Sequence, residues 1–310
     1  MILFFYGPND YLINKKLTEL KDRYATKWGE LNLVSLDGET LSFEQYSSQT
    51  QAMPLLATSR LMVIDNIFAN KNKETLEKIK TSLDRPLQST VVVFIQKGMP
   101  DKRMGLFKAL NKPKIAQEFK ALDENAWRHL AREIAKENST EIETQALTLL
   151  FEYVADDLWR LENEIKKLSC YTSKAITPGD VEDVVTKSIS SNIFSFIDHL
   201  TDTNKKIVLK NLQDLLDSSE PPLKILAMVG FQLRSLCQVK EALEQSSNSY
   251  TISKMTSLAP FQVGKMIASA RRFSWQDLSM MYQLVADFDE NIKTGKIEGK
   301  EALKELVLSI

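Results

Sequence analysis

The first third of the chain alternates short apolar runs with helical patterns. Five apolar or β-branched runs have the length of strands: Ile2–Tyr6, Leu31–Leu36, Leu61–Ile64, Val91–Ile95 and Ile115–Phe119. Segments with the spacing of amphipathic helices separate them: Ile13–Trp28, Phe43–Gln51, Lys73–Leu83 and Met104–Leu110. Apolar strands joined by helical crossovers are typical of a parallel sheet covered on both faces. The pattern therefore predicts a doubly wound α/β domain over residues 1–123.

After this domain the pattern is helical as far as the chain extends. Asp123 is placed to cap a helix, and apolar residues recur at spacings of three and four in the segment that follows. A Ser-rich stretch near residue 188 precedes longer apolar stripes, one of which runs from Leu278 to Ile292. We therefore predict a small helical domain over 124–187 and a helical bundle over 188–310, so that the fold class is α/β plus all-α.

The composition is that of a folded protein with balanced charge. The chain has 40 Lys and Arg against 41 Asp and Glu, and 43% of its residues are hydrophobic. It lacks the overall basic surplus of a dedicated nucleic-acid binder. No apolar run approaches the roughly 18 residues of a membrane span, and Met1 opens a strand instead of a signal peptide. We therefore expect a cytoplasmic protein that makes no use of a membrane.

Cysteine and histidine offer little chemistry. Cys170, Cys237, His129 and His199 all fall within helical patterns, and none has further ligand-type residues at metal-binding spacing. We expect the cysteines to be small buried hydrophobic residues and the histidines to have packing or surface roles. Neither a disulfide nor a metal site is predicted.

The N-terminus has the frame of a phosphate-binding loop but lacks the residues that the loop needs. An apolar strand runs into Gly7 and a helical pattern follows, as in a P-loop. The motif requires Gly, Lys and then Ser or Thr further along, where this sequence has Leu12, Ile13 and Asn14. Phosphate and Mg²⁺ would lose their ligands. We therefore expect no bound nucleotide or other cofactor and no intrinsic catalysis.

Two other matches to nucleotide-enzyme motifs are also incomplete. Asp65 ends the third apolar run, where an ATPase would carry an Asp-Glu pair, but Asn66 follows it. A loop-cap role is the favoured interpretation. The tripeptide Thr294-Gly295-Lys296 follows a helix instead of a strand, so we interpret it as a helix end and turn.

The connection between the second helix and the third strand is unusually apolar. It carries Met53, Leu55 and Leu56 around Pro54, which ends any helix there. Adjacent apolar residues on a surface connection suit insertion into a partner's pocket. They also suit packing onto the sheet beneath, and the residues alone favour burial by a small margin.

Several short matches, taken in order, resemble the delta subunit of the bacterial DNA polymerase III clamp loader. They are Tyr6-Gly7 with Asp10-Tyr11-Leu12, Met53-Pro54-Leu55-Leu56 with Arg60-Leu61, Asp157-Leu158 with Leu161–Leu168, Glu220-Pro221-Pro222 with Ile225-Leu226, Gln232-Leu233-Arg234, Pro260-Phe261-Gln262-Val263, and Asp289 with Ile292–Gly295. Together they extend over nearly the whole chain.

The resemblance implies a degenerate AAA+ module, a helical lid and a C-terminal collar. In that family the collar joins the subunit to gamma or tau and delta-prime subunits in a hetero-pentamer, which is part of a DNA-directed DNA polymerase holoenzyme. The delta subunit binds the sliding clamp (beta) and opens its ring for loading onto primed DNA, while sibling subunits hydrolyse ATP. DNA is contacted through the assembled complex.

The clamp-binding element of that family carries a pair of large apolar residues. By resemblance, the clamp-binding residues of this chain are Gln51, Met53, Leu55 and Leu56. Some relatives have an aromatic residue at the second position of the pair, where this chain has Leu56.

The residues alone leave two alternative functions open. One is an active AAA+ ATPase that uses an unorthodox phosphate loop. The other is a generic helical adaptor unrelated to replication. Binding of ATP would distinguish the ATPase from a non-catalytic clamp-loader subunit. Capture of the sliding clamp would distinguish the clamp-loader subunit from the adaptor.

Overall fold

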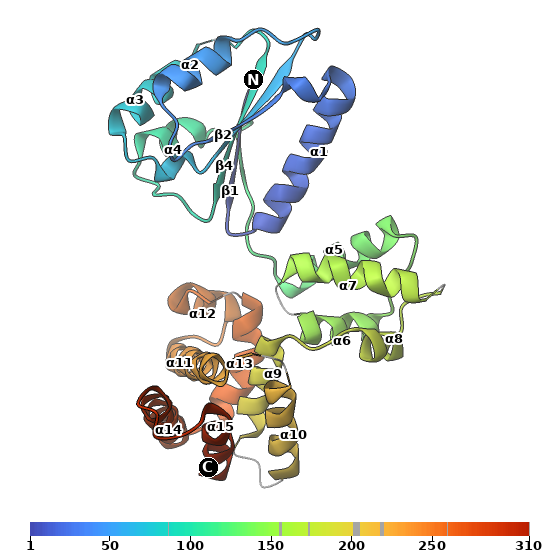
Figure 1. Ribbon diagram of the computed structural model, residues 1–310, viewed down its shortest axis with the longest axis vertical. Helices are drawn as coiled ribbons and strands as arrows, with labels where there is room; N and C mark the ends of the chain where they lie inside the picture. Colours follow the sequence, from blue (N-terminus) through green and yellow to red (C-terminus); the bar gives the residue numbers. More distant parts are fainter. Residues whose placement is uncertain are drawn as a thin grey trace. The chain divides into compact units, whose positions relative to one another are not determined.

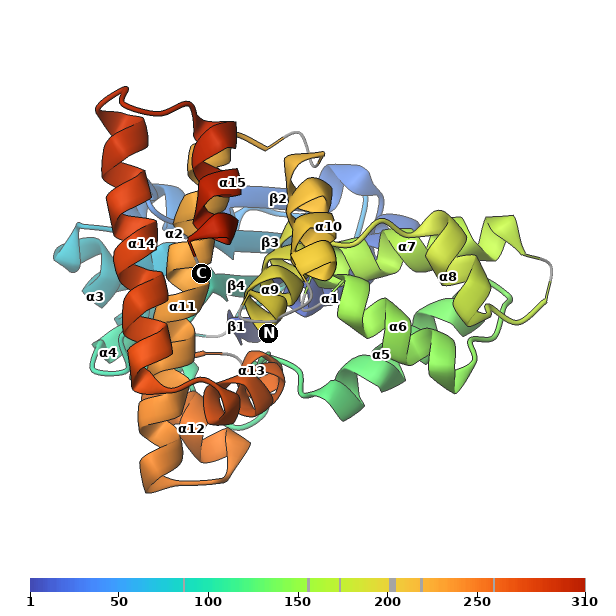
Figure 2. The same cartoon turned by 90° about the horizontal axis from the view of Figure 1, so that it is seen from below.

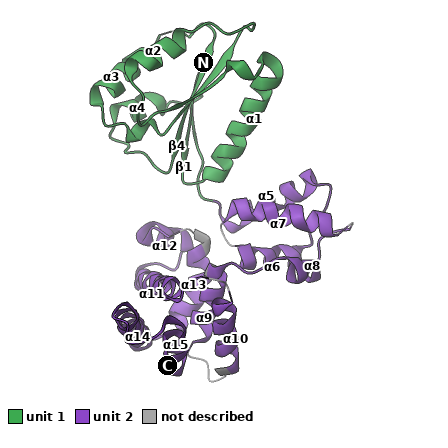
Figure 3. Ribbon diagram, viewed as in Figure 1, with its two compact units in different colours: residues 1–121 green, residues 122–310 purple. Residues whose placement is uncertain are grey.

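The structure is a computed structural model that describes residues 1–85, 87–154, 157–172, 174–200, 205–217, 220–258 and 260–309. It divides into two compact units, Met1–Ala121 and Leu122–Ile310 (Figure 3). Each unit encloses hydrophobic clusters of its own.

A parallel sheet forms the centre of the first unit. The described residues contain five strands: β1 Ile2–Gly7, β2 Leu33–Asp37, β3 Arg60–Asp65, β4 Thr90–Lys97 and β5 Ala116–Glu118. Their order across the sheet is β2-β3-β4-β1-β5, and every pairing is parallel. The predicted α/β class is confirmed. β2 begins later than predicted, because Leu31 belongs to a short 3₁₀ turn, η1 Glu30–Asn32, that precedes the strand.

Helices cover both faces of this sheet. α1 (Asp10–Trp28) lies on one face, and α2 (Phe43–Gln51), α3 (Lys73–Ser82) and α4 (Gly105–Leu110) lie on the other (Figure 1). Because successive strand residues point to opposite faces, Phe4 and Phe94 pack with the three-helix side, whereas Phe5 and Val93 pack on the α1 side. This double burial explains why the central strands β1, β3 and β4 carry continuous apolar runs.

The second unit is built from helices. Its first part contains α5 Glu124–Glu137, α6 Thr144–Val154, α7 Leu158–Tyr171 and α8 Pro178–Val184. Its second part contains α9 Ile189–His199, α10 Lys205–Leu216, α11 Pro222–Gln245, α12 Ser249–Thr256, α13 Pro260–Arg272, α14 Trp275–Lys293 and α15 Gly299–Leu308. The long helix α11 contributes many buried apolar residues to the core of this part and packs beside α13 and α14 (Figure 2).

Two local predictions about the second unit can be compared directly with the structure. The Asp123 side chain accepts a hydrogen bond from the Ala126 N–H at 2.8 Å and so caps α5 as predicted. Near the predicted joint at residue 188, the Ser188 N–H donates to the Tyr153 carbonyl at 2.8 Å. The division of this unit at residue 188 stays a prediction.

Only one of the cysteines matches the expectation of burial. Cys237 on α11 is partly buried, and burial raises the pKa of its thiol. Cys170 on α7 is exposed, so the prediction for it was wrong. The buried stripe of α7 ends at Leu168. Two residues further on, the helix has turned by about 200°, which places Cys170 on the opposite side.

Candidate functional site

The turn between β1 and α1 is too short to wrap a phosphate group. The Asn9 side chain accepts a hydrogen bond from the Leu12 N–H at 3.1 Å, so α1 begins at Asp10, three residues earlier than predicted. Only Pro8 and Asn9 separate strand from helix. Leu12, Ile13 and Asn14, which stand at the positions of the motif's Gly, Lys and Ser/Thr, therefore lie inside the helix, and Ile13 is fully buried.

Gly7 has a structural reason for being glycine. Its φ is +134°, and a Cβ atom there would lie 2.2 Å from the carbonyl oxygen of Phe119. The Gly7 N–H donates to the Gly98 carbonyl at 3.1 Å, and the Gly98 N–H donates back to Gly7 at 2.8 Å. The main chain at the end of β1 is thus used to join neighbouring strands, at the place where a P-loop would present free N–H groups.

The other motif fragments also have structural explanations. Asn66 adopts a left-handed conformation with φ +59° and precedes the short turn η2 (Ile67–Ala69). Its Oδ1 accepts from Gln96 Nε2 at 2.9 Å, while Asp65 beside it is exposed. Thr294 and Gly295 end α14 as predicted, with Gly295 at φ +73°.

Metal-binding and membrane-spanning features can be assessed for the described part of the chain. There, no group of three or more His, Cys, Asp or Glu residues is placed to hold a metal ion. None of the helices described combines the length and the apolar composition that crossing a bilayer requires. His129 is exposed and lies 3.6 Å from the Glu133 carboxylate, and His199 contacts the Ser195 carbonyl at 2.7 Å.

The apolar connection between α2 and β3 is exposed. Met53 is 89% exposed, Leu55 57% and Leu56 101%. The preference for burial of the two leucines, drawn from the residues alone, was therefore wrong for Leu55 and Leu56. Gln51, the last residue of α2, is exposed as well, and its amide Nε2 donates to Ser47 Oγ at 3.0 Å.

Two buried side chains hold this loop at its base. Asn32 exchanges hydrogen bonds with the main chain of Leu55 at 2.8 and 2.9 Å. Arg60, which is 7% exposed, donates to Gln49 Oε1 at 2.9 Å and to the Ala52 carbonyl at 3.5 Å. Sequence reasoning assigned no role to either residue, although Arg60 was part of the family match. Asn32 directly precedes β2 and Arg60 begins β3, so a polar residue at the start of a strand was the available signal.

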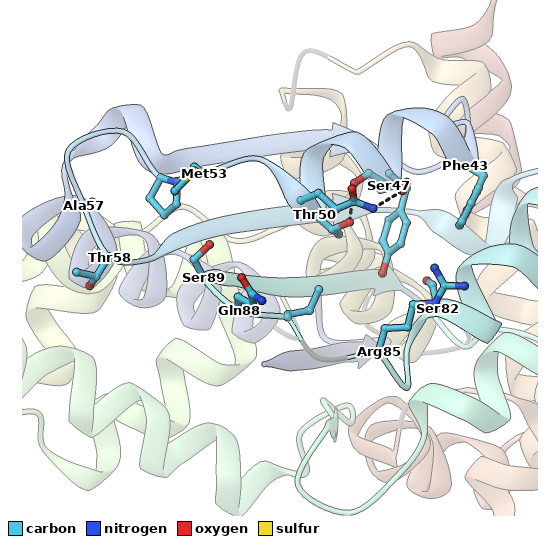
Figure 4. Close-up of a pocket in the computed structure, with 14 residues that line it drawn as sticks. Phe43, Ser47, Thr50, Met53, Ala57, Thr58, Ser82, Arg85, Gln88 and Ser89 are labelled. Atoms are coloured by element: carbon cyan, nitrogen blue, oxygen red, sulfur yellow. Dashed lines mark hydrogen bonds between the residues drawn. The ribbon is translucent and has the colours of Figure 1, made fainter.

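A pocket of about 610 Å³ lies next to the loop. In Figure 4, α2 lines one side of it and Ser82, Arg85, Gln88 and Ser89 line the other, with Met53, Ala57 and Thr58 at one end. Among the described lining residues, Arg85 is the only charged one. Tyr46 also lines the pocket, and burial raises the pKa of its hydroxyl group. In the described part of the lining, none of the hydroxyl groups of serine, threonine or tyrosine has a His, Asp, Glu or Lys beside it.

Fold and site together define a class: a parallel α/β domain followed by helices, with an exposed apolar loop between α2 and β3 and a β1–α1 turn that lacks the P-loop residues. Comparisons with known proteins identify the family. The family model "DNA polymerase III, delta subunit" matches residues 3–120, and the model "DNA polymerase III delta subunit, C-terminal domain" matches residues 190–310. The chain belongs to the family of delta subunits of the DNA polymerase III clamp loader.

A curated relative and a solved structure agree with this family. The DNA polymerase III subunit delta of Bacillus subtilis (strain 168) is 29% identical over 314 residues, which cover 98% of this chain and 90% of that protein. The solved structure of a Bacillus subtilis DNA clamp loader delta protein superposes with a TM-score of 0.77 at 26% identity. The superposition covers 99% of this chain and 94% of the Bacillus subtilis chain.

Proposed function

We propose that this protein is the clamp-opening subunit of a DNA polymerase III clamp loader. Leu55 and Leu56 insert into a pocket on the sliding clamp, and Met53 and Gln51 contact its rim. The observation that carries the proposal is the exposure of both leucines, 57% and 101%, on a loop anchored by buried side chains. Exposed apolar residues that are already ordered suit an interface, because little conformational freedom is lost on binding.

Ring opening follows from a shift in population. A closed clamp interface is in equilibrium with an open form, and a protein that binds the open form more tightly increases its share. The loop needs no chemical step for this, only a higher affinity for the open ring. The opened ring is then loaded onto primed DNA by the assembled loader.

The proposal gives this subunit no ATP hydrolysis of its own and no cofactor. The main chain of Gly7 is hydrogen-bonded to the main chain of Gly98. Ile13, at the position of the P-loop lysine, is buried. Both observations argue against the alternative of an ATPase with an unorthodox loop. The energy for loading would come from sibling subunits that hydrolyse ATP.

The proposal assigns assembly to the helices after residue 188. Large apolar side chains remain exposed there, among them Phe231 (57%), Trp275 (46%) and Leu308 (77%). Such residues suit packing against the corresponding domains of gamma or tau and delta-prime subunits. The protein would act in the bacterial cytoplasm, where DNA is replicated.

Binding to the purified sliding clamp of the same organism tests the proposal. We expect a stable complex between the isolated subunit and the clamp, measured by fluorescence anisotropy with labelled clamp. A subunit that is folded but does not bind the clamp would overturn the proposal.

A further inference from the structure

The loop that carries the two leucines is tied to a side chain from another part of the sequence. Asn32 ends η1, lies 23 positions before Leu55 and is only 3% exposed. Its Oδ1 accepts from the Leu55 N–H at 2.8 Å, and its Nδ2 donates to the Leu55 carbonyl at 2.9 Å. One side chain thus satisfies both main-chain polar groups of Leu55, as a neighbouring strand would.

Asn32 is itself held by rigid elements. Its Nδ2 also donates to the carbonyl of Trp28, the last residue of α1, at 2.6 Å. The next residue, Leu33, begins β2 and pairs with Leu61 of β3. The position of the Asn32 amide is therefore set by α1 and the sheet, and the loop adapts to it.

The backbone of Leu56 needs this kind of support. Its φ is +51°, in the left-handed region that leucine avoids because of contact between Cβ and the backbone. Such conformations persist where the surroundings overdetermine them. The Leu56 side chain is fully exposed, so its own packing cannot provide the support. The hydrogen bonds from Asn32 to Leu55 restrain the main chain one residue before Leu56 and can provide this support.

We propose that Asn32 is a positioning residue for partner binding. It holds the loop in the conformation that presents Leu55 and Leu56, and its burial keeps it from touching the partner. This inference rests on the proposed function, in which the partner is the sliding clamp. The apparent Kd rises in inverse proportion to the fraction of molecules whose loop is in the binding conformation.

The substitution Asn32→Asp isolates this role. It preserves the size of the side chain and the acceptor for the Leu55 N–H. It replaces the amide donor with a carboxylate oxygen, which would face the carbonyl oxygens of Leu55 and Trp28 and be repelled by them.

Asn70→Asp is a matched control in the same unit. Asn70 is 8% exposed, and its Nδ2 donates to the carbonyls of Gly38 and Leu41 at 2.7 and 2.9 Å. Its Oδ1 accepts from the Asn72 N–H at 2.9 Å. The same amide donor is lost, but beyond the opposite end of β3: the leucine loop precedes the strand, whereas Asn70 follows η2 after the strand's carboxyl end.

The experiment measures clamp binding and loop order on the full chain. Affinity for purified sliding clamp is measured at a temperature where circular dichroism shows every variant folded, and amide hydrogen exchange reports on residues 52–59. We expect Asn32→Asp to bind at least about tenfold more weakly and to exchange the Leu55 amide faster. Asn70→Asp should bind like the unmodified protein. If Asn32→Asp fails to fold, Asn32→Ala gives the same test, because it removes both hydrogen bonds to Leu55 without introducing a charge.

Four results would contradict the reasoning in distinguishable ways. Unchanged binding by Asn32→Asp, with loss of binding by Leu55→Ser plus Leu56→Ser, overturns the positioning role and leaves the proposed function standing. Equal losses in Asn32→Asp and Asn70→Asp assign the effect to general destabilisation and also overturn it. Normal binding by the double leucine variant overturns the positioning role together with the assignment of Leu55 and Leu56 as clamp-binding residues, whereas no binding by the unmodified protein refutes the proposed function itself.

Discussion

Replacing Leu55 and Leu56 together by serine should remove most of the affinity for the sliding clamp. Full burial of one leucine side chain contributes about 1.5–3 kcal/mol. Leu56 is fully exposed before binding and Leu55 just over half exposed, so binding can newly bury about one and a half leucines. The loss is therefore about 2–4.5 kcal/mol, or roughly 40-fold to 2,000-fold in Kd.

The same double substitution should leave folding almost unchanged. Exposed substitutions away from special features usually change the free energy of unfolding by less than about 0.5 kcal/mol. Serine keeps the N–H and carbonyl groups at position 55 that Asn32 binds. Had the leucines been buried against the sheet, the two hydroxyl groups would have lowered the free energy of unfolding by several kcal/mol.

Anisotropy titrations with the clamp and thermal melting of the same samples measure both quantities. A control with Leu209→Ser and Leu308→Ser removes two exposed leucines, 47% and 77% exposed, from the second unit and should bind the clamp normally. Intact melting with lost binding supports the assignment. A strongly lowered melting temperature, or unchanged affinity, would show that the wrong residues were assigned.

Three further predictions concern other parts of the chain. Calorimetry should detect no ATP binding, because Leu12, Ile13 and Asn14 are helix residues; micromolar affinity that changes when Gly7 is altered would contradict this. A chain truncated after residue 187 should bind the clamp but no longer co-elute with the other loader subunits, and retained co-elution would refute the assignment of assembly to the bundle. Gly7→Ala should destabilise the first unit by more than about 2 kcal/mol in urea unfolding, since the new Cβ would lie 2.2 Å from the Phe119 carbonyl oxygen; a loss under about 0.5 kcal/mol would show that the strands move apart easily.

The sequence by itself determined the features that depend on neighbouring residues. Short apolar or β-branched runs located the five strands of the described residues, most clearly β1, β3 and β4, whose burial on both faces of the sheet leaves a local composition signal. The cap at Asp123 could be predicted because its contact reaches only three residues ahead. The replacement of the P-loop residues by Leu12, Ile13 and Asn14 was equally a matter of spacing along the chain.

Only the tertiary structure decided which apolar residues stay exposed. Leu55 and Leu56 have the composition of core residues, and what keeps them at the surface is Asn32, 23 residues away in sequence. Likewise, the closure of the Gly7 turn depends on Gly98 and Phe119, which reach it through the strand order β4-β1-β5. Contacts of this kind join residues that are far apart in sequence, so no short window of sequence contains both partners. They form because the fold as a whole has the lowest free energy.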